Sequence, residues 1–265
     1  MSTLAADGSV DLFGHEGQAK MYKDFRPRYT KEVVEFVLSK VSERGLCVDV
    51  ACGSGQLTNL LGPHFAKVIG IDRSFEQLSN ASSSAPNIEY RAGSAFALPV
   101  DSGSADLITV AQGLHWLVPY ENFFTEVRRV LKPGGVFVTV GYMFPRLVNA
   151  KANKAALYFY EEVLKSKLSP GDPGCWWETN RPTIDCEYRD IPFPGKIERV
   201  SLPAIVEVSI PHYVSYLRTL SAYRTLMKSG AEDPLVKLET EVVNAVGDPA
   251  AMIEVVNPFF AVCMM

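Results

Sequence analysis

The chain has 265 residues, enough for one large α/β domain or for a core with a small cap. Its 47% hydrophobic and 21% charged residues are those of an ordinary globular protein, and the net charge of −4 argues against a nucleic-acid-binding surface. The absence of a long apolar run, a signal-peptide pattern and paired cysteine motifs among the five cysteines predicts a cytoplasmic protein that binds no membrane.

The first predicted elements come before residue 40. Residues 1–12 have the character of a loose tail, and the segment that follows carries Tyr22 and Arg26 in a Tyr-x-x-x-Arg-Pro-x-Tyr run. Thr30 is a candidate N-cap for a helix whose valines lie on one side. The chain therefore enters its core through a segment that holds an aromatic side chain and an arginine.

A strand, a glycine turn and a helix follow. Residues 48–50 predict the end of a buried strand, and Gly53 and Gly55 allow the backbone to take positive φ and approach a ligand. Residues 56–65 predict a helix with an apolar face. The next strand ends in Asp72, whose carboxylate is placed to accept from ribose hydroxyls. This arrangement predicts a site for a nucleotide-like cofactor.

The residues around the turn favour a cationic cofactor over a dinucleotide. Thr58 stands where a dinucleotide loop has its third glycine, and Asp49 would repel a pyrophosphate but suits a sulfonium. Asp49, Gly53, Gly55 and Asp72 together resemble the class I S-adenosylmethionine-dependent methyltransferases. The resemblance implies S-adenosylmethionine as cofactor. It also implies a Rossmann-like α/β fold: a seven-stranded, mostly parallel sheet with an antiparallel last strand and helices on both faces.

The resemblance also implies a set of cofactor-binding residues along the carboxyl edge of the sheet. The expected set is Asp49, Ala51, Gly53, Ser54, Gly55, Asp72, Arg73, Gln77, Ser94, Ala95 and Gln112. Ser74 and Gln77 have the spacing of a capping box for a short helix. After the third strand, at 87–91, the family usually has an acid that accepts from the adenine amino group. Ser94 stands there instead and would accept more weakly, while the Ala95 backbone remains available.

The fourth predicted strand, 106–111, leads into His115 and Trp116 at the ligand-binding edge of the sheet. His115 is a candidate to orient a substrate or act as a general base, with Trp116 stacking on the substrate. The alternative is that both residues only pack. Their Ala-x-x-x-His-Trp run, like the run with Tyr22 and Arg26, resembles the trans-aconitate methyltransferase-like branch. There the entry segment folds over the cofactor, which would bring catalytic Tyr22 and substrate-binding Arg26 into the site; otherwise they fix the N-terminus to the core.

The second half of the chain follows a different pattern. Helix 120–131, a Leu-Lys-Pro-Gly-Gly turn and strand 136–140 complete the resembling part. Residues 145–195 are rich in aromatics and turn formers, and we expect a cap insertion over the active site within a single domain of residues 1–265. A small satellite core is the alternative. The remaining expected elements are a strand at 197–210, helices at 213–227 and 233–246, and a last strand at 257–263.

Arg218 and Tyr223 lie on the predicted helix 213–227, in a run that again resembles the small-acid branch. The resemblance implies that this helix faces the substrate pocket, where Arg218 would hold an anionic group. Solvent exposure of the arginine is the alternative. The sequence shows no metal-binding pattern.

The leading hypothesis is an S-adenosylmethionine-dependent methyltransferase that acts on a small molecule, with a carboxylate as the oxygen acceptor. Such an acceptor needs no base, because the protein has only to align it with the methyl group and exclude water. A nicotinamide-dependent oxidoreductase and a non-catalytic interaction protein with a methyltransferase fold are the alternatives. We expect a monomer or weak dimer without a nucleic-acid partner.

Overall fold

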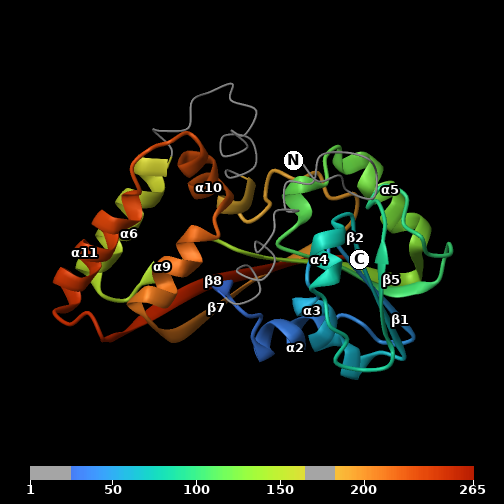
Figure 1. Cartoon of the computed structure of the whole chain (residues 1–265). Helices are drawn as coiled ribbons and strands as arrows, with labels where there is room; N and C mark the ends of the chain where they lie inside the picture. Colours follow the sequence, from blue (N-terminus) through green and yellow to red (C-terminus); the bar gives the residue numbers. More distant parts are fainter. Residues whose placement is uncertain (1–24, 165–182) are drawn as a thin grey trace.

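The computed structural model describes residues 25–164 and 183–265. Figure 1 shows a sheet covered by helices and, beside it, a second group of helices. Tyr22 and the part of the expected cap at 165–182 lie outside the described residues.

The strands belong to one sheet. They are β1 (Leu46–Val50), β2 (Lys67–Asp72), β3 (Ile88–Ala92), β4 (Ala105–Ala111), β5 (Leu131–Tyr142), β6 (Arg146–Leu147), β7 (Ile197–Ser209) and β8 (Met252–Met264). Their order is β3-β2-β1-β4-β5-β8-β6, with β7 paired to β8. The pairs among β1 to β5 are parallel, and β8 runs antiparallel to β5, β6 and β7. The predicted Rossmann-like sheet with a reversed last strand is confirmed; the two-residue β6 makes it eight-stranded in the described residues.

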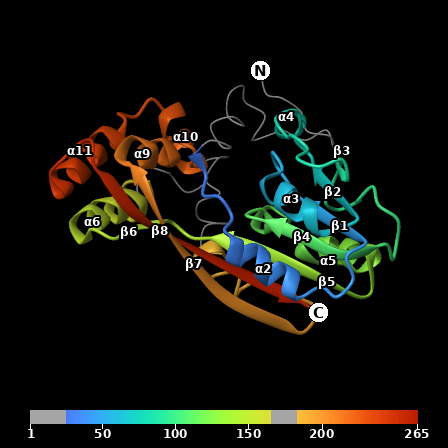
Figure 2. The same ribbon diagram turned by 90° about the horizontal axis from the view of Figure 1, so that it is seen from below.

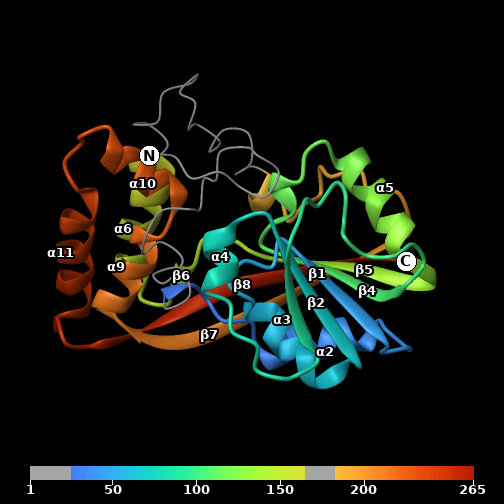
Figure 3. The same ribbon diagram turned by 45° about the vertical axis from the view of Figure 1, so that its right-hand side comes forward.

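Helices cover both faces of this sheet. They are α2 (Lys31–Ser39), α3 (Gln56–Leu61), α4 (Phe75–Ser79) and α5 (Tyr120–Val130), with short 3-10 turns at Gly62–His64 and Leu114–Trp116. Side chains alternate along β1, so Val48 and Val50 pack in one cluster with Phe123 of α5. Cys47 points the other way, into a cluster with α2 and α3. Figure 3 shows the sheet lying between α5 and the pair α2 and α3.

A second group of helices has its own apolar core. It consists of α6 (Ala150–Tyr158), the π-helix η3 (Phe159–Leu164), α9 (Ile210–Arg218), α10 (Ser221–Lys228) and α11 (Pro234–Val246), and we call it the helical unit. β7 and β8 run from the main sheet to this unit as a paired ribbon (Figure 2). The helical unit takes its helices from 150–164 and 210–246, so it extends well beyond the expected insertion at 145–195.

Two predicted helices end earlier than expected. The helix predicted over 56–65 stops at Leu61, and a 3-10 turn containing Pro63 follows. The single helix predicted over 213–227 is two helices, because α9 ends at Arg218 and α10 begins at Ser221. At the break, both the backbone N–H and the hydroxyl of Thr219 donate to the Tyr216 carbonyl, over 2.9 and 2.6 Å. Within 25–164 and 183–265, no helix combines the length and apolar character needed to cross a membrane.

Candidate functional site

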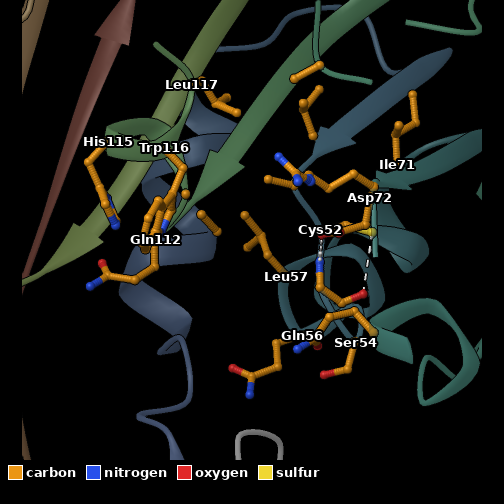
Figure 4. A pocket seen from close by; sticks show the side chains of 18 of the residues that line it. Cys52, Ser54, Gln56, Leu57, Ile71, Asp72, Gln112, His115, Trp116 and Leu117 are labelled. Atoms are coloured by element: carbon orange, nitrogen blue, oxygen red, sulfur yellow. Dashed lines mark hydrogen bonds between the residues drawn. The ribbon is translucent and has the colours of Figure 1, made fainter. Parts of the chain in front are cut away.

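A cavity lies at the carboxyl ends of β1, β2 and β4, and the break between α9 and α10 forms part of its wall. The sequence-predicted residues that line it are Arg26, Ala51, Gly53, Ser54, Asp72, Arg73, Gln77, Ser94, Ala95, Gln112, His115 and Trp116. Figure 4 shows Asp72 and Ser54 on one side of the cavity, and Gln112 and His115 on the other. We call these the Asp72 side and the His115 side.

The glycine turn and Asp72 form one hydrogen-bonded unit. Gly53 and Gly55 have φ of 56° and 82°, in the left-handed region that glycine adopts without strain. One Asp72 oxygen accepts from the Gly53 N–H over 2.8 Å, and the other accepts from the Ser74 N–H over 2.8 Å. Asp72 therefore fixes the turn after β1 relative to the start of α4. Gly55 belongs to the turn but is absent from the cavity wall.

Asp49 does not face the cavity, which corrects the expectation that its charge meets the cofactor. It lies on the α3 side of β1 and is completely buried. Its oxygens accept from the hydroxyls of Thr58 and Thr109, over 2.6 and 2.7 Å. Burial raises the pKa of Asp49 to about 6, although both hydroxyls favour its charged form. Side-chain alternation along the strand, with Cys47 and Asp49 on the same face, explains this placement.

Two amide side chains bring unsatisfied polar atoms to the cavity wall. Ser74 caps α4 by accepting from the Gln77 N–H over 3.3 Å, but the Gln77 side chain does not complete the predicted capping box. Instead, Gln77 Oε1 is buried and has no hydrogen-bond partner among the described residues. Gln56 Nε2 is also buried and also has no hydrogen-bond partner among the described residues, and both glutamines line the cavity. Such atoms carry a free-energy cost that a ligand with a matching donor and acceptor would remove.

Ser94 keeps its place on the wall but uses its oxygen locally. Its Oγ accepts from the Phe96 N–H over 3.2 Å, which leaves one lone pair and the hydroxyl proton for a ligand. Phe96 lines the cavity beside it and is 39% exposed. Sequence reasoning missed Phe96, because an aromatic residue in a loop carries no periodic signal.

The His115 side combines a buried imidazole with aromatic neighbours. His115 is 3% exposed, and its Nδ1 lies 3.1 Å from the hydroxyl of Tyr188. The Trp116 ring centroid lies 5.3 Å from that of His115. Ile184, from the same segment as Tyr188, adds an apolar patch to the cavity wall. This side therefore offers one titratable ring within a largely apolar surface.

Arg26 joins the sheet to the helical unit at the edge of the cavity. Its guanidinium donates to the Tyr142 hydroxyl over 3.2 Å and to the Thr219 carbonyl over 3.1 Å. The guanidinium also lies over the Tyr216 ring, 5.6 Å from its centroid. The Gln112 amide exchanges hydrogen bonds of 3.1 and 2.8 Å with the Tyr142 backbone, which places Arg26 on the His115 side.

Arg218 and Tyr223 are not on the cavity wall, contrary to the expectation for their helix. The break at Thr219 changes the helix direction and turns Thr219 to Ala222 toward the cavity instead. Burial, and then Asp233, raise the pKa of Tyr223, and Arg218 acts in the opposite direction. Both residues thus belong to a polar group of the helical unit. No three or more His, Cys, Asp or Glu side chains cluster as a metal site in the described ranges.

Comparison with known proteins identifies a matching family and relatives. Residues 48–139 match the family described as "Methyltransferase domain". A protein of Dictyostelium discoideum whose name describes it as a candidate methyltransferase is 34% identical over 238 residues, which cover 89% of this chain and 86% of that protein. Further curated relatives align over about half of their own length.

Solved structures agree with this match. The structure of a candidate type II methyltransferase from Anaeromyxobacter dehalogenans superposes with a TM-score of 0.79 at 26% identity, covering 91% of this chain and 97% of that one. Phosphoethanolamine N-methyltransferase 2 of Haemonchus contortus, solved with S-adenosyl-L-methionine, shares the fold with a TM-score of 0.51 at 14% identity, over 97% of this chain and 60% of that one.

Proposed function

Since this chain belongs to the S-adenosylmethionine-dependent methyltransferase family, we propose that it methylates the carboxylate of a small organic acid. The family supplies the reaction class and the cofactor. The acceptor is our proposal, and the observation that carries it is the guanidinium of Arg26 on the His115 side of the cavity.

The Asp72 side fits the methyl donor. Gln77 Oε1 and Gln56 Nε2 are a buried acceptor and a buried donor that a polar ligand would satisfy. Asp72 would accept from ribose hydroxyls, and Ser54, Arg73, Ser94 and Ala95 would complete the contacts. When bound, the donor supplies an activated methyl group on a sulfonium. The chain's own task is to orient the two reactants and exclude water.

The charges on the His115 side support an anionic acceptor. Among the described residues that line the cavity, the only carboxylate is Asp72, across the cavity from His115. Arg26 gives the same cavity wall a positive charge. An arginine binds a carboxylate through paired hydrogen bonds, which leave a second lone pair on an oxygen for the methyl group.

Several narrower features belong to the same proposal. The trans-aconitate methyltransferase-like branch, where small acids are the acceptors, agrees with a cationic group in the site. The net charge of −4 supports a small-molecule substrate rather than nucleic acid. We propose a cytoplasmic monomer or weak dimer, with Tyr22 contributing from the entry segment.

The proposal is tested by incubating the protein with S-adenosylmethionine and a panel of small carboxylic acids, alcohols and amines. We expect S-adenosylhomocysteine and a methyl ester with carboxylic acids. Arg26→Lys should raise KM for the acid by roughly ten- to 100-fold, because a charge-assisted bidentate contact contributes about 1.5–3 kcal/mol.

Tyr142→Phe is the matched control, since it removes one hydrogen-bond partner of Arg26 and keeps the guanidinium. A contact with the substrate predicts a much larger effect of Arg26→Lys than of Tyr142→Phe. Methylation of alcohols or amines alone would refute a carboxylate acceptor. Equal KM changes in the two variants would assign Arg26 to structure.

A further inference from the structure

Tyr188 connects a segment outside the methyltransferase match to the imidazole in the cavity. The residue is completely buried, and its hydroxyl lies 3.1 Å from His115 Nδ1. The two ring centroids are 6.2 Å apart. Phe260 of β8 packs edge-on against the Tyr188 ring, with centroids 5.1 Å apart. The hydroxyl is thus held at His115 by packing from the main sheet.

The backbone around Tyr188 is strained in a way that fixes its direction. Glu187 and Tyr188 have φ of 56° and 60°, a conformation that costs free energy for residues with a side chain. The Tyr188 N–H donates to the Thr183 carbonyl over 2.9 Å, and its carbonyl accepts from Ile191 over 3.3 Å. Two consecutive left-handed residues persist only where the surroundings impose them. In this structure, the strained backbone places the Tyr188 hydroxyl against His115.

The hydrogen bond between the two residues has a preferred direction. A phenol, with an ordinary pKa of about 10, gives up a proton more readily than a neutral imidazole N–H, and imidazole nitrogen is a good acceptor. These acidities favour donation from the Tyr188 hydroxyl to His115 Nδ1. Donation in this direction would place the imidazole proton on Nε2 and make the neutral ring a hydrogen-bond donor at that atom.

We propose that Tyr188 is a positioning residue that holds His115 in one orientation and in the Nε2–H tautomer. This inference rests on the proposed function, because a donor at Nε2 suits a carboxylate acceptor that already carries its negative charge. His115 then helps to orient the acceptor and removes no proton from it. The segment at 183–191 thereby acts on the cavity through His115.

The experiment is nitrogen NMR of the protein with labelled histidine, which distinguishes the two tautomers of a neutral imidazole. We expect His115 in the Nε2–H form in the native chain and a mixture of forms in Tyr188→Phe. Tyr213→Phe is the matched control, because Tyr213 is also completely buried and its hydroxyl has no partner among the described residues. Its spectrum at His115 should match that of the native chain.

A second variant keeps the packing in case Tyr188→Phe folds poorly. 3-Fluorotyrosine at position 188 is a stronger acid than tyrosine, so it should strengthen the donated hydrogen bond and shift the Nδ1 resonance further toward a hydrogen-bonded acceptor. An Nδ1–H form in the native chain, or an unchanged Nδ1 resonance in both variants, would overturn the inference. These readouts need no acceptor, so failure to find a carboxylic acid substrate would count against the proposed function alone.

Discussion

The Tyr90 ring lies against Gly55 so closely that a Cβ added to Gly55 would come within 2.7 Å of Tyr90 Cζ. Asn59 donates to the Tyr90 hydroxyl over 3.1 Å and holds the ring there. Gly55 also has φ of 82°. The nearby Tyr90 ring and the left-handed backbone therefore both require glycine at position 55, although Gly55 does not line the cavity.

Gly55→Ala should destabilise the protein more than Gly103→Ala. Gly103 has φ of 62° with nothing near the added Cβ, so its substitution measures the backbone cost alone, about 1–2 kcal/mol. Crowding by Tyr90 should add roughly 1–3 kcal/mol at Gly55. Urea unfolding of both variants gives the comparison, and equal losses would show that Tyr90 moves aside freely.

Asp72→Asn should weaken S-adenosylhomocysteine binding by about 1–3 kcal/mol, roughly five- to 150-fold in Kd. The change replaces a charged acceptor by an amide of the same shape. Asp106→Asn is the control, because Asp106 also accepts from backbone N–H groups, of Gly45 and Leu46, but does not line the cavity. Calorimetry should show a changed Kd for the first variant only. An unchanged Kd in Asp72→Asn would show that Asp72 does not contact the ribose.

Gln77→Met should weaken ligand binding without destabilising the ligand-free protein. Oε1 of Gln77 has no hydrogen-bond partner within residues 25–164 and 183–265, so its removal leaves the ligand-free protein as stable as before or more stable. The lost contact should weaken S-adenosylhomocysteine binding by roughly 1 kcal/mol. Gln112→Met should behave differently, because the Gln112 amide is paired with the Tyr142 backbone and its loss destabilises the fold. Thermal unfolding with and without ligand separates the two. A destabilised ligand-free Gln77→Met protein would contradict this assignment.

Asp49→Asn should alter the pH dependence of stability. The folded-state pKa of Asp49, about 6, lies above its ordinary value of 3.8, so the native state binds more protons between these values. The contribution of Asp49 to the free energy of unfolding therefore rises as pH falls from about 7 to 4, by an amount on the order of 3 kcal/mol at most.

The asparagine variant lacks this contribution. The stability of the native chain minus that of Asp49→Asn should grow over the same pH interval, as measured by urea unfolding at matched pH. A difference that stays constant from pH 7 to 4 would mean that Asp49 is ionised throughout this interval.

The parts predicted well from the sequence are those with local patterns. Gly53 and Asp72 stand at strand ends, where apolar runs and turn residues mark both the element and its edge. The mostly parallel sheet and its reversed last strand followed from the family resemblance rather than from any local signal.

The parts predicted poorly are those that apolar periodicity and turn residues do not mark. The spacing of Asp49 before the glycines matched the family, but side-chain alternation along β1 turns its carboxylate toward Thr58 and Thr109 instead of the cavity. The break at Thr219 is a local hydrogen-bonding choice within an otherwise helical pattern, and residues 219–222 line the cavity instead of Arg218. Tyr188 gave no signal because its partner, His115, lies 73 residues earlier.

The β7–β8 ribbon limits how the site can adapt to different acceptors. The two strands pair from Ile197 opposite Met264 to Ser209 opposite Met252, and α9 starts at the next residue. The continuous hydrogen-bonded pairing of β7 and β8 resists stretching and sliding of the two strands. The helical unit is therefore connected to the main sheet by a rigid ribbon and not by a flexible linker. Acceptor size should then be selected by the bulk of the side chains at 219–222, and small-to-large exchanges there offer a route to altered selectivity.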